Sequence, residues 1–106
     1  MVPTNETHCA EDCPVHKTSK IIEGKWTTLI VRDLLSGKKR YSELQRSVET
    51  ISPKLLAARL RLLEQKQLVK RTIYPTVPPT TEYELTPLGR KLEKVISAMS
   101  EFGKLL

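Results

Sequence analysis

Two cysteines and two histidines near the N-terminus are the side chains of this 106-residue chain best suited to redox or metal chemistry. Cys13 stands directly before Pro14, which favours the first position of a helix, so its thiol is expected at a helix N-terminus. That position, Lys17 one turn later and the nearby His16 favour the thiolate, whereas two preceding acids oppose it. Cys13 is therefore a candidate for oxidation or electrophile modification, and Cys9 could resolve its oxidised form.

Other interpretations of these residues stay open. Cys13 could be an inert thiol, or each cysteine could pair across a dimer. Four possible zinc ligands also lie close together in the sequence: His8, Cys9, Cys13 and His16. Their spacing is not a common structural pattern, and a helix start is an awkward place to turn all four inward. We therefore expect an incidental cluster, with no metal and no other cofactor.

Positive charge is concentrated in one third of the chain. Residues 36–71 contain ten Lys or Arg against three acids, a local charge of +7, whereas the whole chain carries +6. The ten basic residues are Lys38, Lys39, Arg40, Arg46, Lys54, Arg59, Arg61, Lys66, Lys70 and Arg71. One basic face on a nearly neutral body is the electrostatic footprint expected of a phosphate-binding surface.

A helix with clear start signals lies at the centre of this basic segment. Ser52 is a favourable N-cap and Pro53 a favourable first residue, so we expect a helix that runs to about Gln67. Its apolar stripe, which must face the core, consists of Leu56, Leu60 and Leu63. Its opposite face consists of Lys54, Ala58, Arg61 and Gln65. We expect this second face to contact the bases or phosphates of double-stranded DNA.

Further DNA-backbone contacts are expected on either side of this helix. The candidates are Lys38, Lys39, Arg40, Ser42, Ser52, Lys70 and Arg71. The alternative for the charged ones is a solvated turn and edge-strand charges that discourage aggregation. Residues 76–80 contain no Lys or Arg, so we expect them to touch the backbone only through Thr hydroxyls and main-chain N–H groups. Arg59 points sideways on the helix and is expected to be structural, pairing with an acid.

The remaining elements follow from apolar spacing and from Pro and Gly punctuation. Helices are expected over residues 14–23, 25–36 and 42–48, with a very short strand at Tyr41. The second helix has a core stripe that consists of Trp26, Leu29, Ile30, Leu34 and Leu35. Strands over 69–74 and 81–85 form a hairpin whose tip is the proline-rich segment 75–80.

Thr86 and Pro87 begin a last helix of about five turns. Its apolar stripe consists of Leu88, Leu92, Val95, Met99, Phe102 and Leu106. A domain of this size cannot cover the whole stripe, so we expect part of it to pack on another subunit. The predicted fold class is α+β, mostly α: a winged helix-turn-helix with an extra helix at each end.

Length and composition limit the possible domain organisation and cellular location of the chain. We expect a flexible lead over residues 1–12 and one domain over 13–106, without an apolar stretch that could span a membrane. The two cysteines are too close in sequence to staple a fold, and a cytoplasmic location is expected.

Eight short motifs, in order and with little insertion, carry a family resemblance. They are Cys13-Pro14-Val15, Gly24-Lys25-Trp26, Arg32-Asp33-Leu34-Leu35, Tyr41-Ser42-Glu43-Leu44, Ile51-Ser52, Arg59-Leu60-Arg61-Leu62-Leu63-Glu64, Leu68-Val69-Lys70-Arg71 and Tyr83-Glu84-Leu85-Thr86-Pro87-Leu88-Gly89. From Cys13 to Leu106 the chain resembles the HxlR-type group of MarR-like bacterial transcription regulators. Two departures are Glu23-Gly24, where the family often has Gly-Gly, and Gln67, where it often has glycine. A left-handed helix end suits Gln less well than Gly, so the central helix is expected to end differently.

The resemblance implies a homodimer, held by the first and last helices, on a two-fold DNA operator. The expected interface residues are Val15, Ile22, Leu92, Val95, Met99, Phe102 and Leu106. It also implies a repressor or activator from a bacterium or archaeon, with an oxidant or small molecule as a possible effector. Some family members sense electrophiles or oxidants through the cysteine that corresponds to Cys13.

Two other classes of function were weighed. An enzyme acting through Cys13 and His16 is disfavoured because the chain has no phosphate-binding glycine loop and no acid-base constellation. A winged-helix module that binds only protein is compatible with the fold, but the uneven charge argues against it.

Overall fold

The computed structural model describes residues 13–48 and 50–106, so the expected lead, including His8 and Cys9, lies outside the described residues. The elements are α1 (Pro14–Ile22), α2 (Trp26–Leu34), β1 (Lys39–Arg40), α3 (Tyr41–Ser47), α4 (Pro53–Gln65), β2 (Val69–Tyr74), β3 (Thr80–Leu85), α5 (Pro87–Arg90) and α6 (Leu92–Gly103). This is a winged helix-turn-helix with additional helices at both ends, as predicted.

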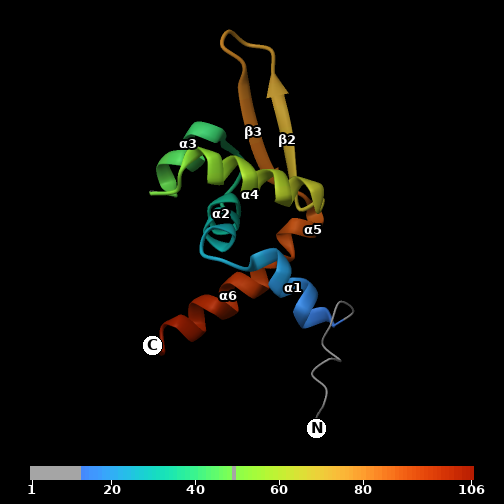
Figure 1. Ribbon diagram of the computed structural model, residues 1–106, viewed down its shortest axis with the longest axis vertical. Coiled ribbons are helices and arrows are strands. Elements are labelled where there is room, and N and C mark those ends of the chain that lie inside the picture. Colours follow the sequence, from blue (N-terminus) through green and yellow to red (C-terminus); the bar gives the residue numbers. More distant parts are fainter. Residues whose placement is uncertain (1–12, 49) are drawn as a thin grey trace.

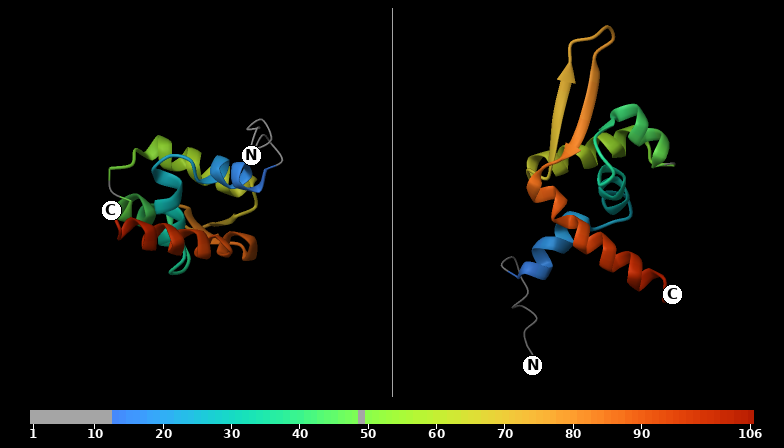
Figure 2. Two further views of the ribbon diagram at one scale, coloured as in Figure 1. Left: turned by 90° about the horizontal axis from the view of Figure 1, so that it is seen from below. Right: turned by 180° about the vertical axis from the view of Figure 1, so that it is seen from behind.

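The hairpin and the terminal helices occupy opposite ends of the molecule. Figure 1 shows β2 and β3 projecting at the top, α3 and α4 beside the hairpin base, and α1 and α6 at the bottom. The view from behind in Figure 2 shows the same separation. A surface that includes α4 and the hairpin is therefore distinct from one that includes α1 and α6.

The sheet is antiparallel with the order β1-β3-β2. The short strand was predicted at Tyr41, but it consists of Lys39–Arg40, and Tyr41 begins α3. The Glu43 carboxylate accepts a hydrogen bond of 2.8 Å from the backbone N–H of Arg40, which starts the helix at the next residue. The expectation for Tyr41 was wrong because this side-chain cap competes with strand extension.

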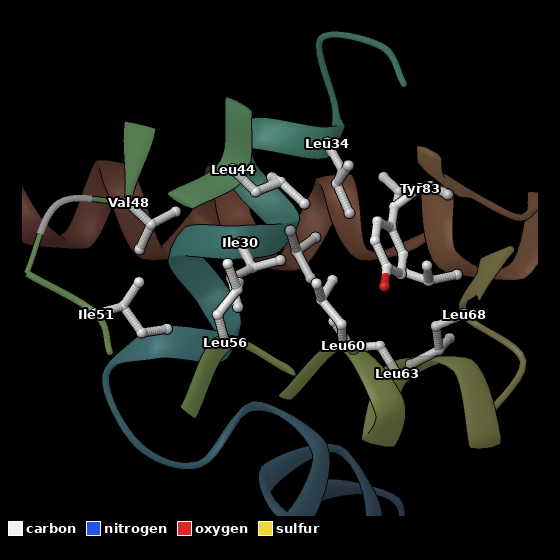
Figure 3. Close-up of a cluster of buried hydrophobic side chains, with 13 residues drawn as sticks. Ile30, Leu34, Leu44, Val48, Ile51, Leu56, Leu60, Leu63, Leu68 and Tyr83 are labelled. Carbon is white, nitrogen blue, oxygen red and sulfur yellow. The ribbon is translucent and has the colours of Figure 1, made fainter. Parts of the chain in front are cut away.

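The core joins α2, α3 and α4 to the base of the hairpin. Figure 3 shows Ile30, Leu44, Leu56 and Leu60 directed towards a common centre, and these four side chains are essentially inaccessible to solvent. The predicted leucine stripe of α4 is buried in full. The predicted stripe of α2 is buried at Ile30 and Leu34 but only partly elsewhere, and it omitted the fully buried Val31.

The two predicted helix caps, Ser52 of α4 and Thr86 of α5, are both present in the structure. The Ser52 hydroxyl accepts the N–H of Leu55 at 3.1 Å, and the Thr86 hydroxyl accepts the N–H of Gly89 at 3.0 Å. The Thr86 hydroxyl also donates to the carbonyl of Gln67 at 2.7 Å. Thr86 therefore ties the end of α4 to the start of α5.

Helix α4 ends in the left-handed conformation that was expected to be avoided without a glycine. Gln67 has φ +63°, its N–H donates to the Glu64 carbonyl at 3.0 Å, and the N–H of Leu68 donates to the Leu63 carbonyl at 2.9 Å. These two bonds form a Schellman motif. The buried Leu68 and the Thr86 bond stabilise the turn and outweigh the strain of a side chain at positive φ.

The last helix was predicted as continuous, but it is divided at Lys91 into α5 and α6. The backbone N–H of Lys91 donates a hydrogen bond of 3.1 Å to the carbonyl of Leu88, three residues earlier, instead of the four-residue spacing of an α-helix. This bond marks the break. Leu88 is 52% exposed and does not continue the inward stripe of α6. One turn before α6, Gly89 of α5 packs closely against the main chain at Leu68.

Within the described residues, no helix is both long and apolar enough to cross a lipid bilayer.

Candidate nucleic-acid interface

Helix α4 separates the core from an exposed basic face. The side chains on the side opposite the leucine stripe are all exposed: Lys54, Ala58, Arg61 and Gln65. Figure 1 shows α4 lying across the front of the molecule, beside the hairpin base. The helix is therefore fixed by its buried leucines while its basic side faces solvent.

Two side chains of α3 bind the backbone at the start of α4. The Tyr41 hydroxyl donates to the carbonyl of Pro53 at 3.0 Å, and the Gln45 amide nitrogen donates to the carbonyl of Ile51 at 2.8 Å. Thr50, in the turn between the helices, has φ +72°. These bonds hold the N-terminus of α4 relative to α3. They were missed from the sequence because Tyr41 and Pro53 are twelve residues apart and no local pattern links them.

The other predicted DNA contacts surround α4. All are exposed except Lys39, which is half-buried; the set is Lys38, Lys39, Arg40, Ser42, Ser52, Lys70 and Arg71. They come from β1 and the residue before it, the start of α3, the cap of α4 and strand β2. The fold thus brings together, around one helix, residues that span 34 positions of the sequence, from 38 to 71.

An acid lies within this basic surface. Glu64 of α4 forms an ion pair with Arg71 of β2, with 3.5 Å between Oε2 and Nε. Both residues line a hollow of about 310 Å³ together with Arg61, Ala57 and Tyr83. Burial raises the pKa of the Tyr83 hydroxyl.

Arg59 is held at the junction of α4 with the turn between α1 and α2. Its Nη2 lies 3.7 Å from the place that a Cβ at Gly24 would occupy, and its Nε is buried without a hydrogen-bond partner. The predicted structural role agrees with this position. The acid expected to pair with it is not found among the described residues.

The hairpin tip is uncharged and organised by its own hydroxyls. The Thr76 hydroxyl donates to the Pro78 carbonyl at 2.7 Å and lies 3.0 Å from the Thr80 hydroxyl. Lower on the hairpin, the Tyr74 hydroxyl donates to the Glu82 carboxylate at 3.0 Å, which raises the pKa of Tyr74. Val77 is almost fully exposed at the tip.

Cys13 is half-buried and occupies the N-cap position of α1 as predicted. Its carbonyl accepts the N–H of Lys17 at 2.9 Å. Of the four possible zinc ligands only Cys13 and His16 belong to the described residues, and that part of the chain contains no cluster of three metal-ligating side chains.

The expected dimer residues form exposed apolar surface on the terminal helices. Val15, Met99, Phe102 and Leu106 are exposed, whereas Ile22, Leu92 and Val95 are partly buried. On α6 this surface forms a groove of about 680 Å³, lined by Lys94, Val95, Ala98, Met99, Phe102, Gly103 and Leu106. Figures 1 and 2 show α6 extending away from the rest of the fold.

The class of this protein is defined by its winged helix-turn-helix fold, in which α4, the second helix of the helix-turn-helix, has an exposed basic face. The family model for HxlR-like helix-turn-helix proteins matches residues 21–106, and the chain belongs to this family. It is 42% identical over 94 residues to the HTH-type transcriptional regulator YdeP of Bacillus subtilis strain 168, covering 89% of this chain and 73% of that protein.

Solved structures agree with this assignment. A MarR-family transcriptional regulator from Porphyromonas gingivalis W83 superposes with a TM-score of 0.86 at 40% identity, covering 98% of this chain and 97% of that one. The redox regulator HypR in its oxidised form superposes with a TM-score of 0.82 at 39% identity, covering 89% and 97%. The protein is therefore a transcriptional regulator of the helix-turn-helix type.

Proposed function

We propose that this regulator is a homodimer that binds a two-fold DNA operator sequence-specifically, with one α4 helix in the major groove of each half-site. The observation that carries the proposal is the exposure of Lys54 and Arg61 on a helix whose other side forms the core. An α-helix fits the major groove, where Arg and Lys discriminate base pairs by hydrogen bonds to guanine.

The contacts divide by chemistry. Base contacts are assigned to the exposed face of α4, which consists of Lys54, Ala58, Arg61 and Gln65. Backbone contacts are assigned to Lys38, Lys39, Arg40, Ser42, Ser52, Lys70 and Arg71. The hairpin would reach the adjacent groove and touch the backbone through hydroxyls and main-chain N–H groups.

The dimer would form through the apolar surfaces of α1 and α6. Phe102 is 63% exposed and Leu106 is 93% exposed, and the α6 groove around them contains one charged residue, Lys94. Apolar surface of this kind marks an interaction site on a small domain. A two-fold dimer would place its two α4 helices about one helical turn of DNA apart.

DNA binding is tested with the region upstream of the regulator's own gene. Fluorescence anisotropy of this duplex and of a shuffled duplex, at several salt concentrations, gives affinity, specificity and the salt slope. Arg61→Ala is expected to cost about 1–3 kcal/mol of specific binding and to relax base preference. Arg90→Ala, which removes an exposed charge from α5, is the matched control. Binding that ignores salt and sequence contradicts DNA recognition and favours a protein-interaction module.

We further propose that Cys13 senses oxidants or electrophiles. The redox regulator HypR shares the fold at 39% identity, and Cys13 stands at the start of a helix assigned to the dimer interface. Modification there would move the two α4 helices relative to one another and spoil the half-site spacing. Anisotropy with and without diamide tests this. Wild type should lose affinity and Cys13→Ser should keep it, whereas equal binding in all four measurements contradicts sensing.

A further inference from the structure

A second hollow lies between the start of α3 and the hairpin strand β3. Its volume is about 340 Å³, and it is lined by Arg40, Tyr41, Ser42, Pro79, Thr80 and Thr81. The pairing of β1 with β3 sets its width, because Arg40 stands opposite Glu82 in the register. The hollow is near the small end of ligand-binding cavities, a size suited to a compact polar group.

The lining suits an anion. Its lining residues include one cation, Arg40, and no acid. They also include Ser42 and Thr81, whose hydroxyls have no other partner among the described residues, whereas the Thr80 hydroxyl already bonds to Thr76. The Tyr41 hydroxyl already donates to the Pro53 carbonyl, so this ring serves as a fixed wall. Arginine and hydroxyl groups in one place are typical donors to phosphate oxygens.

Two acids close to Arg40 in sequence or in strand register, Glu43 and Glu82, each accept a hydrogen bond from another group. The Glu43 carboxylate accepts the backbone N–H of Arg40 at 2.8 Å, and the Glu82 carboxylate accepts the Tyr74 hydroxyl at 3.0 Å. The preceding residues Lys38 and Lys39 add positive charge next to Arg40. Both carboxylates keep their charge, so the three cations Lys38, Lys39 and Arg40 face two anions, and an anion in the hollow would meet a small net positive charge.

The position of the hollow selects one kind of anion. It lies between the helix-turn-helix and the hairpin, which the proposed function assigns to the major groove and to the adjacent groove. A DNA strand is what separates two neighbouring grooves, so a protein with one element in each must straddle that strand. The phosphates of the straddled strand pass between the two elements.

We propose that this hollow seats one phosphodiester group of the DNA backbone in each half-site. Arg40 supplies the charge, and Ser42 and Thr81 supply hydrogen bonds from the helix side and the hairpin side. The inference rests on the proposed function. It adds to that function a single phosphate that fixes the angle between the hairpin and the helix-turn-helix. It also gives the hairpin, whose tip carries no charge, a defined role in backbone binding.

The test pairs DNA variants with protein variants. A duplex selected by the wild-type chain from a random pool is synthesised with one methylphosphonate at a time, which removes one phosphate charge. At one position per half-site the wild type should lose about tenfold in affinity, the range expected for hydrogen bonds to a charged group. In Arg40→Gln, Ser42→Ala and Thr81→Val the same DNA substitution should cost about twofold or less, because the contact is already absent.

Thr72→Val is the matched control, since it removes a half-buried hydroxyl from the hairpin outside the hollow. It should keep the full tenfold loss, and circular dichroism melting checks that every variant folds. The proposal of a phosphate site in the hollow is contradicted if, at every DNA position, the affinity losses from the methylphosphonate and from each of the three protein substitutions simply add. DNA binding itself would be unaffected by that result. A wild type that selects no duplex refutes the proposed function itself.

Inorganic phosphate distinguishes a DNA phosphate from a free anion. Up to about 10 mM phosphate should leave the amide resonances of Ser42 and Thr81 unchanged, because one small anion brings none of the other DNA contacts that hold the strand in place. Phosphate binding in this range that Arg40→Gln abolishes would make the hollow a free-anion site and overturn the proposal.

Discussion

At Glu64 the basic surface contains a negative charge that works against its proposed use. The ion pair with Arg71 joins α4 to β2, and both side chains are more than one-third exposed, so its contribution to stability is small. In the proposed complex, Glu64 would compete with a DNA phosphate for Arg71. We therefore expect Glu64 to reduce the affinity of the proposed DNA complex while it joins the helix to the hairpin.

Replacing this acid should strengthen DNA binding. Glu64→Gln removes one negative charge and releases Arg71, so we expect affinity to rise about threefold, the scale of an exposed ion pair. Anisotropy at low salt measures the change, because the effect must shrink as ions screen it. Glu93→Gln on α6 makes the same chemical change far from the basic surface and should leave affinity unaltered. Weaker binding by Glu64→Gln would show that the ion pair positions the helix.

At the scale of elements, Tyr41 is one of the two side chains of α3 that bind the backbone at the start of α4. Tyr41→Phe removes the bond to the Pro53 carbonyl and leaves the ring in place. We expect DNA affinity to fall about fivefold, because a reading helix must be held to within about half an ångström. The protein should remain folded, since one neutral hydrogen bond contributes about 1 kcal/mol.

Tyr74→Phe is the matched control for Tyr41→Phe. It also removes one hydroxyl hydrogen bond, but from the Glu82 pair on the hairpin rather than from the start of α4. Affinity and melting temperature are measured for both variants. Equal losses of affinity would contradict a special role for Tyr41.

The junction of α4, β3 and α5 depends on the absence of a side chain at position 89. A Cβ built on Gly89 would lie 2.0 Å from the carbonyl oxygen of Leu68, so Gly89→Ala must displace backbone. We expect a loss of about 3 kcal/mol or more in the free energy of unfolding, because the clash is with main chain and cannot be relieved by a rotamer change.

Gly103→Ala provides the comparison, because a Cβ at Gly103 meets no atom within 4 Å. Its stability should stay equal to wild type or rise slightly, as Ala favours helix over Gly. Urea unfolding monitored by circular dichroism gives both values. A Gly89→Ala variant as stable as Gly103→Ala would mean that α5 can move away from Leu68 at little cost.

At the scale of the whole molecule, the proposed function gives each end of the fold its own role: one end would bind DNA and the other would bind the second copy. The basic surface lies near the hairpin, whereas the exposed apolar surface belongs to α1 and α6 at the far end (Figure 1). A second copy bound there would cover apolar surface without obstructing α4. Each copy would then present its own helix to one half-site.

Phe102→Glu should separate the copies. A carboxylate in the α6 groove would be buried against apolar surface in a dimer, which is strongly unfavourable. Light scattering should report half the wild-type mass, and operator affinity should fall by about tenfold or more as the two half-sites are no longer bound together. Leu88→Glu, on the exposed side of α5, should change neither quantity. A wild type that is already monomeric would refute the proposed dimer.

Much of the fold follows from signals contained within a few residues. Ser52 and Pro53 start α4, Thr86 and Pro87 start α5, and the leucine spacing fixes which side of α4 is buried. The basic segment and the exposed face of α4 were equally predictable, because charge composition and helical period are read directly from neighbouring positions. Short-range signals of this kind act whatever surrounds them.

Contacts between distant residues determined the rest. Gly89 of α5 packs against the main chain at Leu68, and the bond from Thr86 to Gln67 holds a left-handed turn that the isolated residue disfavours. Tyr41 reaches Pro53, and Arg40 meets Thr81 across a hollow, only after the chain has folded. The amino-acid sequence by itself determined most of the elements, the buried face of α4 and the charge of its exposed face. Tertiary structure alone decided the angles and hollows between elements, because these depend on packing among residues that no local pattern connects.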